Sequence, residues 1–381
     1  MKKIVFLTGT RADFGKLKSL IKISQESKNY DVHIFATGMH MNSLYGATVD
    51  EIYKSGFTNI YQYINHETIE YMERTLAKTI DGFSRYIAEI KPDMIVVHGD
   101  RLEAMAGAIV GGFNNILVTH IEGGEISGTI DESIRHAVSK LAHIHFVANE
   151  EAKERLIQLG EYRDSIFILG SPDLDLMVSD NLPSLKHAKE YYNITYNDYA
   201  IAIFHPVTTE YKDISVQVKI FIDALIESEK NYILIYPNND VGSVEILNEY
   251  KRLKNNNRFK VFPSLRFEYF LRFLKESTFM VGNSSAGLRE APFYNIPTID
   301  IGTRQNNRVK LTSIFHSNYD KKNIIQNIQN IQKYNESKSN LECSYHFGQG
   351  KSDKLFLELL NSETLWDISC QKQLQKLDTD E

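Results

Sequence analysis

Two stretches in the first half of the chain indicate its fold: MIVVHGDRLE at residues 94–103 and ILVTHIEGGE at residues 116–125. Each begins with an apolar, β-branched run typical of a buried strand and passes at once into glycine and acidic residues. A third block, GTIDESIRH at residues 128–136, places further acids just beyond. Because ligands bind at the carboxyl ends of strands in an open parallel α/β sheet, these blocks predict a site there. The alternative is that the acids only cap the helices that follow.

The alternation of strand and helix continues on both sides of these blocks and predicts two doubly wound α/β domains, 1–170 and 171–363, that face each other across a cleft. A break at Gly170-Ser171-Pro172-Asp173 separates the two rounds of alternation. An exposed loop is expected at 335–340. The expected strands lie near 4–7, 32–36, 93–98, 115–119, 143–148, 165–169, 199–204, 232–236, 259–262, 278–281 and 297–301, and the expected helices at 69–90, 101–112, 131–141, 150–159, 214–228, 241–254, 266–275, 286–291, 351–360 and 364–376.

Length and composition narrow the class of protein. A chain of 381 residues suits two domains, and 42% hydrophobic with 24% charged residues is ordinary for a globular protein. A net charge of -6 without a long basic block argues against a nucleic-acid surface. Cys343 and Cys370 lack metal-ligand spacing, and neither a signal peptide nor a membrane-spanning stretch is evident. We therefore expect a cytoplasmic protein without nucleic-acid, membrane or metal partners.

The first predicted strand ends in GTRADFGK at residues 9–16, which matches neither the dinucleotide-binding fingerprint nor the P-loop. A nicotinamide-dependent oxidoreductase is therefore disfavoured. Arg11 and Lys16 lie at a strand-to-helix turn, where backbone N–H groups and the helix dipole favour anions, so we expect a phosphate-bearing ligand. The alternative is that both are solvated cations near a helix start.

Two turns in the second half complement that expectation. GNSSAGLRE at residues 282–290 begins a predicted helix with hydroxyl groups at Ser284 and Ser285 that could receive a diphosphate, or could simply cap the helix. Glu290, one turn later, could accept hydrogen bonds from ribose hydroxyls. Arg304, at another strand end, is suited to pairing with phosphate.

Histidines at strand ends are further candidates. His205 follows the strand that opens the second sheet, so we expect it to contact phosphate or substrate. His40 and His98 end strands in the first domain. His143 and His145 fall inside strand-like runs, together with His33, and are interpreted as structural.

The residues together resemble the hydrolysing UDP-N-acetylglucosamine 2-epimerases of sialic acid biosynthesis. The resemblance spans the chain and depends on the order and spacing of several motifs, and the first turn and the HIEGGE block resemble the hydrolysing branch of a wider epimerase family. The motifs are those at 9–16, 98–103, 120–125, 128–136, 204–206, 236–240, 281–290 and 302–305.

The resemblance implies two Rossmann-like domains of the glycosyltransferase-B type, with UDP bound mainly by the second and a C-terminal helix at about 364–381 returning to the first. It also implies a homodimer or homotetramer, and no cofactor or metal. Asp100, Glu122, Asp131 and His205 match catalytic positions of the family. The positions expected to contact substrate are Arg11, Lys16, His40, Arg101, Arg135, Asn238, Asn239, Ser284, Ser285, Glu290 and Arg304.

The implied reaction converts UDP-N-acetylglucosamine and water to N-acetylmannosamine and UDP. The hydrogen on the carbon bearing the acetamido group is not acidic, so its removal must accompany loss of UDP, giving a 2-acetamidoglucal that water then attacks. The division of acid and base among Asp100, Glu122 and Asp131 stays open, and Glu125 or Glu132 could replace a neighbour. The alternatives are a UDP-2,4-diacetamido-trideoxyhexose substrate on the way to legionaminic-type acids, a glycosyltransferase, and a UDP-sugar sensor without turnover.

Overall fold

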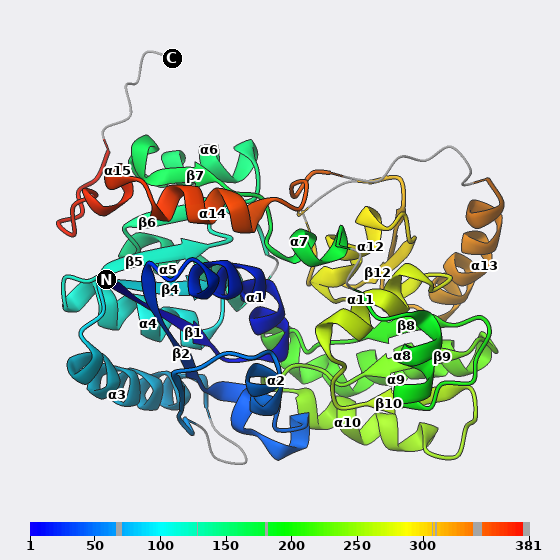
Figure 1. The fold of residues 1–381 in the computed structure, drawn as a ribbon. Helices are drawn as coiled ribbons and strands as arrows, with labels where there is room; N and C mark the ends of the chain where they lie inside the picture. The colour runs from blue at the N-terminus through cyan, green and yellow to red at the C-terminus, as the bar shows by residue number, and fades with distance from the viewer. Residues whose placement is uncertain are drawn as a thin grey trace. The chain divides into compact units, whose positions relative to one another are not determined.

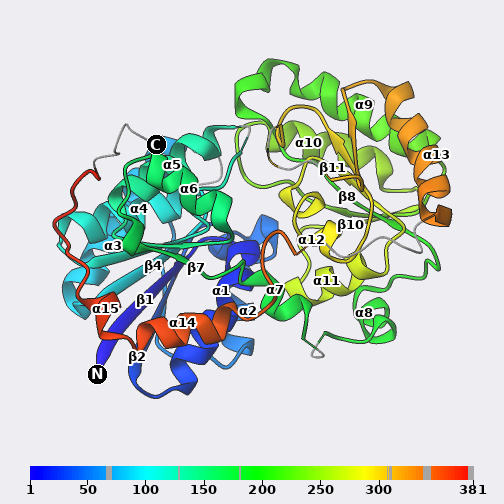
Figure 2. The same ribbon diagram turned by 90° about the horizontal axis from the view of Figure 1, so that it is seen from above.

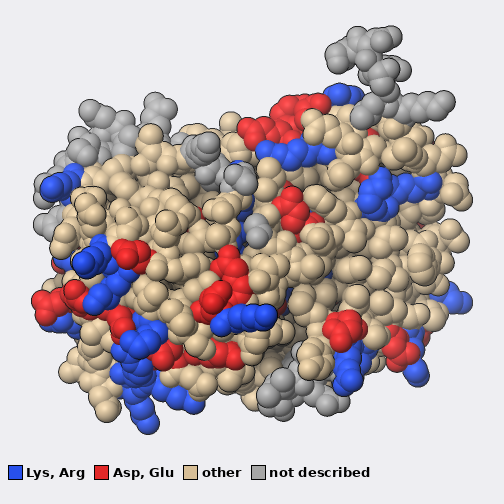
Figure 3. Space-filling view, turned by 180° about the vertical axis from the view of Figure 1, so that it is seen from behind, with Lys and Arg blue, Asp and Glu red and all other residues tan. Residues whose placement is uncertain are grey.

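The computed structural model describes residues 1–65, 71–127, 129–179, 182–306, 308, 311–337 and 345–375. The chain forms two units (Figure 1). The first comprises Met1–Glu125, Asp131–Asp180 and His346–Glu381, and the second Ile126–Ile130 and Asn181–Tyr345. Within the described residues, no helix is both long and apolar enough to cross a membrane. On the face drawn in Figure 3, acidic and basic side chains are interspersed rather than gathered by sign.

A parallel sheet forms the middle of the first unit, with strand order β3-β2-β1-β4-β5-β6-β7. Alternate residues of its strands enter separate hydrophobic clusters on the two faces, as Val96 and Val97 of β4 do. Helices α1 and α14 cover one face and α3, α4 and α5 the other (Figure 2). The strands are β1 (Lys2–Thr8), β2 (Tyr30–Ala36), β3 (Ile60–Gln62), β4 (Met94–His98), β5 (Leu117–Ile121), β6 (Ile144–Val147) and β7 (Ile166–Ile168); the helices are α1 (Arg11–Glu26), α2 (Val49–Lys54), α3 (Met72–Ile90), α4 (Leu102–Phe113), α5 (Ile130–Leu141), α6 (Glu150–Gln158), α7 (Asp173–Met177), α14 (Ser352–Leu360) and α15 (Glu363–Trp366).

The second unit repeats this topology in a parallel sheet of order β10-β9-β8-β11-β12-β13. In both sheets the order reverses between the first and fourth strands of the unit, which is where ligands bind in doubly wound folds. The α/β fold class predicted for both halves is confirmed. The strands are β8 (Ala200–Ile203), β9 (Tyr232–Ile235), β10 (Phe259–Phe262), β11 (Met280–Gly282), β12 (Thr298–Ile301) and β13 (Ile314–Ser317); the helices are α8 (Leu185–Tyr192), α9 (Ile214–Glu227), α10 (Ser243–Tyr250), α11 (Phe267–Lys275), α12 (Glu290–Phe293) and α13 (Lys321–Ser337).

The C-terminal part of the chain differs from the expectation. Helix α14 lies in the first unit, where Phe356 packs against Phe6 and Phe146, although the predicted second domain extended to residue 363. The helix predicted at 364–376 is wrong beyond α15, because the segment from 367 to 375 is held by separate polar contacts instead. For example, the Cys370 carbonyl accepts from His143 Nε2 at 3.1 Å. Residues 376–381 lie outside the described chain.

Two expectations in the second unit also need correction. The helix predicted at 286–291 is a 3-10 turn, Ser285–Gly287, followed by the single turn of α12. The Gly287 carbonyl accepts from Thr298 Oγ1 at 2.7 Å, which diverts it from a continuous helix ladder. The predicted loop at 335–340 begins inside α13, which ends at residue 337, and the rest of it lies outside the described residues.

Candidate active site

Glu122 lies at the centre of a buried polar cluster in the first unit. It follows β5 directly and has a φ of 63°, in the left-handed region that costs a non-glycine residue about 1–2 kcal/mol. Two bonds hold its backbone there: its N–H donates to the Phe146 carbonyl at 2.9 Å, and Arg135 Nη1 donates to its carbonyl at 2.6 Å. Backbone strain that the surroundings enforce in this way is concentrated at functional sites.

Three side chains from different elements contact the Glu122 carboxylate. Ser171 Oγ donates to Oε1 at 2.6 Å, and Lys16 Nζ lies 3.4 Å from the same oxygen. His98 Nε2 lies 3.3 Å from Oε2. Because Glu122 is only 5% exposed, these interactions are weakly screened by solvent. A carboxylate in this setting is suited to exchanging a proton with a bound molecule.

Arg135 connects Glu122 to a second carboxylate. Its guanidinium is buried and forms an ion pair with Asp100, which follows the end of β4 and is partly exposed. Asp131 precedes Arg135 by four residues on α5, so the two lie on the same side of the helix. The structure thus groups Asp100 with Glu122 and places Asp131 one helical turn from their shared arginine.

Lys16 faces carboxylates rather than an open anion site. Its Nζ lies 3.4 Å from Glu122 and 3.6 Å from Asp173, and the side chain is almost fully buried. Ser171 and Asp173 belong to the block at 170–173, which the break in the alternation predicts only as a domain boundary. The sequence does indicate a site role for this block, because it follows a predicted strand just as the other acidic blocks do.

The turn at residues 9–16 uses part of its own backbone N–H groups for internal bonds. The Asp13 carboxylate accepts the N–H groups of Gly9 and Thr10, each at 2.9 Å. The Thr10 side chain in turn accepts from the Asp13 N–H, which completes a capping box at the start of α1. The N–H groups of Gly9, Thr10 and Asp13 are thus engaged by the chain itself, and phosphate binding at this turn stays a prediction.

Arg11 and Arg101 each lie near an acidic side chain. Arg11 Nη2 is 3.8 Å from Glu51, and Arg101 Nε is 3.7 Å from Glu103. Both arginine side chains keep partial exposure, 16% and 23%, so their charges remain accessible to a ligand.

Two buried histidines of the first unit, His40 and His120, bond groups next to the site. His40 is completely buried, and its Nε2 and Nδ1 bond Thr8 Oγ1 at 3.0 Å and Thr48 Oγ1 at 2.7 Å. Burial lowers the pKa of His40 to about 4, so the ring is neutral at pH 7. With both nitrogens engaged inside the unit, His40 holds the end of β1, and the direct substrate contact that we predicted for it has no ring nitrogen to use.

His120, in β5, is likewise completely buried, with both ring nitrogens bonded. Its Nε2 donates to the Gly99 carbonyl at 2.8 Å, and its Nδ1 lies 3.1 Å from Ser139 Oγ. Burial lowers the pKa of His120 to about 3, so the neutral ring accepts from the Ser139 hydroxyl. His120 thereby fixes the turn that leads into Asp100.

In the second unit, Asn283 and His205 are joined across the reversal in strand order. The Asn283 amide accepts from the His205 N–H at 2.6 Å and donates to the His205 carbonyl at 2.8 Å. The N–H of Asn238, which follows β9, donates to His205 Nδ1 at 3.0 Å. A ring that accepts at Nδ1 carries its proton on Nε2 when neutral. Asn283 is completely buried, and the sequence predicts no role for it.

The other candidates of the second unit surround this pair. Arg304 Nη1 donates to the Asn283 carbonyl at 3.2 Å, Glu290 is buried at the start of α12, and Asn239 is partly exposed beside Asn238. Ser284 accepts from the Ala286 N–H at 3.4 Å, so it caps the 3-10 turn, as the alternative interpretation proposed. Ser284 and Ser285 are both partly exposed.

The backbone at this edge requires glycine. Gly282, the last residue of β11, has a φ of 133°, and a Cβ there would lie 1.9 Å from the Ile203 carbonyl oxygen. This close approach lets β11 end directly beside β8, which brings Asn283 to His205. Across the residues that the structure describes, no group of three His, Cys, Asp or Glu side chains is placed to hold a metal ion.

Comparison with known proteins gives a consistent result. Residues 22–361 match the family model described as UDP-N-acetylglucosamine 2-epimerase. The chain is 49% identical over 374 residues to UDP-N-acetylglucosamine 2-epimerase of Neisseria meningitidis, covering 98% of each chain. It is 32% identical over 367 residues to a hydrolysing UDP-N,N'-diacetylbacillosamine 2-epimerase of Legionella pneumophila, covering 95% of this chain and 96% of the relative.

Solved structures share the fold. A Neisseria meningitidis UDP-GlcNAc 2-epimerase bound to UDP-GlcNAc has a TM-score of 0.79 at 18% identity, covering 94% of this chain and 99% of that one. A Methanocaldococcus jannaschii enzyme in complex with UDP-GlcNAc and UDP has a TM-score of 0.79 at 22% identity, with the same coverage.

Proposed function

The chain belongs to the UDP-N-acetylglucosamine 2-epimerase family, and we propose that it is a hydrolysing epimerase that converts UDP-N-acetylglucosamine and water to N-acetylmannosamine and UDP. The identity of 49% to a relative of that name over nearly the whole chain supports the substrate. The observation that carries the chemistry is the enforced conformation of Glu122: its buried carboxylate lies beside His98, and its backbone carbonyl accepts from Arg135, which pairs with Asp100.

The reaction needs groups that transfer protons to and from a sugar carbon. The hydrogen at the carbon bearing the acetamido group is removed as the anomeric bond to UDP breaks, so base and leaving-group stabilisation must act together. Asp100, Glu122 and Asp131 supply the carboxylates. Lys16 and Arg135 compensate their charge, which allows several acids to share one buried region.

The second unit is proposed to hold the nucleotide. Its strand ends present neutral donors and acceptors around His205 and Asn283, with Arg304 as a cation for the diphosphate. The Ser285 hydroxyl and the buried Glu290 carboxylate are suited to the diphosphate and the ribose hydroxyls, respectively. His205 is the further active-site group of the proposal.

A second candidate substrate is a UDP-diacetamido-trideoxyhexose, because the Legionella relative is named for that class of sugar. Its identity of 32% is lower than the 49% of the Neisseria relative, which favours UDP-N-acetylglucosamine. A side-by-side turnover assay with the two UDP-sugars decides between them. The homodimeric or homotetrameric state and the cytoplasmic location remain predictions.

The decisive experiment is turnover of UDP-N-acetylglucosamine in deuterated water, followed by NMR. The expected products are UDP and N-acetylmannosamine that carries deuterium at the epimerised carbon. Unlabelled N-acetylmannosamine would contradict proton removal by an exchanging carboxylate, and UDP-N-acetylmannosamine as the final product would contradict hydrolysis.

A further inference from the structure

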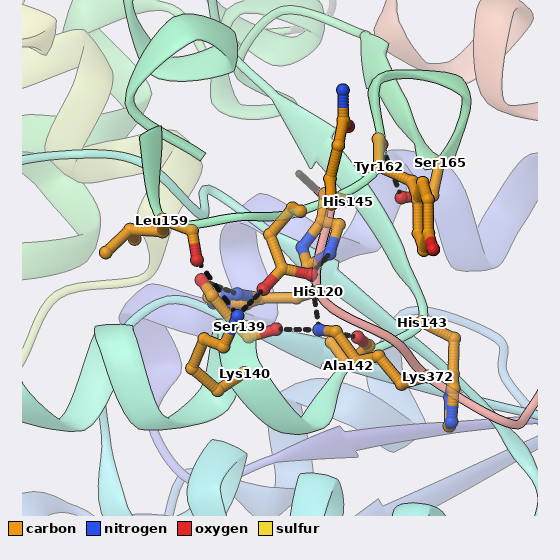
Figure 4. A network of polar contacts seen from close by, with 12 residues as sticks. His120, Ser139, Lys140, Ala142, His143, His145, Leu159, Tyr162, Ser165 and Lys372 are labelled. Atoms are coloured by element: carbon orange, nitrogen blue, oxygen red, sulfur yellow. Dashed lines mark hydrogen bonds and ion pairs between the residues drawn. The ribbon is translucent and has the colours of Figure 1, made fainter. Parts of the chain in front are cut away.

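A buried ionic cluster lies outside the proposed catalytic groups, in the first unit. Glu161 is 1% exposed, and its carboxylate pairs with Lys140 at 2.7 Å, with His145 at 3.1 Å and with Lys372. Lys372 belongs to the C-terminal segment (residues 367–375). Figure 4 shows its side chain entering the cluster from that segment. None of these four side chains has a role in the proposed chemistry.

Lys372 also closes the end of α5. Its Nζ donates to the carbonyls of Ser139 at 2.6 Å and Ala142 at 2.5 Å, as drawn in Figure 4. The last carbonyls of a helix lack partners within the helix and carry the negative end of its dipole, so a buried ammonium group stabilises them. The C-terminal segment is therefore bonded to the last turn of α5 through Lys372.

The other contacts of α5 lead to the proposed site. Its first turns carry Asp131 and Arg135, and Arg135 bonds both Asp100 and the Glu122 carbonyl. In its third turn, Ser139 bonds His120, which donates to the Gly99 carbonyl. A displacement of α5 along its axis would therefore move groups on both sides of Asp100.

The charges of the cluster favour its persistence at neutral pH. Burial alone would raise the pKa of Glu161, but the hydrogen bonds from His145 and Lys140 and the nearby charge of Lys372 outweigh burial and lower this pKa to about 2, while burial lowers the pKa of His145 itself. Burial lowers the pKa of Lys372 to about 8, against the opposing effect of Glu161. Both groups are charged at pH 7, and truncating Lys372 would leave a buried carboxylate with fewer partners.

We propose that Lys372 is a positioning residue for the reaction: by closing the C-terminal end of α5, it sets the placement of Arg135 and, through Ser139 and His120, of the Gly99–Asp100 turn. This inference rests on the proposed epimerase activity. The inference assigns a role to the C-terminal segment, which is held by polar contacts where the sequence predicts a helix.

The main test compares Lys372→Met with Gln375→Ala. Gln375 anchors the same segment outside α5, because its side chain accepts from the Arg163 N–H at 3.0 Å, so it is the matched control. Lys372→Met should lower kcat about ten- to a hundred-fold, because small displacements of reacting groups cost that much. KM and UDP affinity should stay within about threefold, and Gln375→Ala should keep the kcat of the wild type.

A milder variant covers the case in which Lys372→Met does not fold. Ser139→Ala leaves the Lys372 cap in place and removes only the hydroxyl that bonds His120, and it should lower kcat about three- to tenfold with KM unchanged. A purely structural role would instead lower the melting temperature while the folded enzyme keeps its kcat. Wild-type kcat in folded Lys372→Met or in Ser139→Ala would overturn the proposal.

Hydrogen exchange separates this inference from the proposed activity, since it needs no substrate. Lys372→Met should increase amide exchange in α5 and in residues 98–102, whereas Gln375→Ala should affect only residues 160–163 and the C-terminal segment. If exchange in Lys372→Met rises only at the C-terminal segment and the last turn of α5, the positioning role is wrong. An inactive wild type with the expected exchange pattern would count against the proposed function alone.

Discussion

The two units share a sheet topology, but their strand ends have opposite chemical character. In the first unit the strand ends carry buried charges that neutralise one another, as Glu122 and Lys16 do. In the second unit the corresponding edge is centred on an amide and an imidazole, those of Asn283 and His205, and Arg304 donates to the Asn283 carbonyl. This difference indicates that the topology of the sheet determines where a site forms, while the residues of the turns after the strands determine its chemistry.

The largest effect is expected from the acids of the first unit. Glu122→Gln keeps the shape of the side chain and removes its proton-accepting charge, so kcat should fall about a thousandfold while UDP affinity stays within about threefold. Asp100→Asn and Asp131→Asn should each lose about a hundredfold. Steady-state kinetics and calorimetric titration with UDP measure both quantities.

Glu132→Gln, next to Asp131, is the control and should leave kcat nearly unchanged. A loss of kcat there that equals the loss in Asp131→Asn would contradict the assignment of the catalytic role to Asp131.

A change in the second unit should affect binding instead. Asn283→Ala removes both amide bonds to His205, so UDP should bind at least about tenfold more weakly, and the free energy of unfolding should drop by about 2 kcal/mol. The effect on kcat at saturating substrate should be smaller than the effect on KM. Asn327→Ala, which removes a partly exposed amide on α13, is the matched control. Unchanged UDP affinity in folded Asn283→Ala would remove the second unit from the nucleotide site.

Acid should destabilise the two units differently. The pKa values of His40 and His120 are lowered by burial to about 4 and about 3, so the unfolded chain binds protons that the folded unit does not. The stability that His40 and His120 contribute is complete above the histidine pKa of about 6.5 in the unfolded chain. It is lost as the pH falls toward the folded-state pKa values of about 4 and about 3. In the second unit the described histidines, His187, His205 and His316, are all at least partly exposed.

Asp300 acts in the opposite direction, because burial raises its pKa and its cost to stability diminishes as the pH falls. Burial also raises the pKa of Asp175 in the first unit, to about 6, but this single carboxyl opposes two histidines there. Hydrogen exchange at pH 7 and pH 5 should therefore show protection lost first in the first unit. Simultaneous loss of protection in both units would contradict this assignment.

The smallest effects should separate capping from ligand contact at the two serines of the second unit. Ser284→Ala should cost about 0.5–1 kcal/mol of stability, because the hydroxyl caps the 3-10 turn, with little change in UDP affinity. Ser285→Ala should leave stability unchanged and weaken UDP binding about fivefold if its hydroxyl bonds the diphosphate. Thermal unfolding and UDP titration distinguish the two, and the reverse pattern would exchange their roles.

Much of the fold and part of the site follow from local patterns. The β-branched runs before residues 98 and 120, followed at once by acids, predicted both the parallel sheet and the grouping of Asp100 and Glu122. These predictions succeed because strand propensity and the position of a turn depend on neighbours in the sequence. The short strand β13 and the interruption after Gly287 were not predicted, because they depend on packing against distant residues.

The sequence by itself therefore determined the class of fold, the edge of each sheet where a site forms, and the residue types available there. Only the tertiary structure decided the partners: that Lys16 lies against Glu122, 106 residues away, and that the C-terminal segment caps α5 instead of forming a helix. The physical reason is that a buried charge must find a partner wherever the fold brings one close, and no periodicity along the chain encodes that distance.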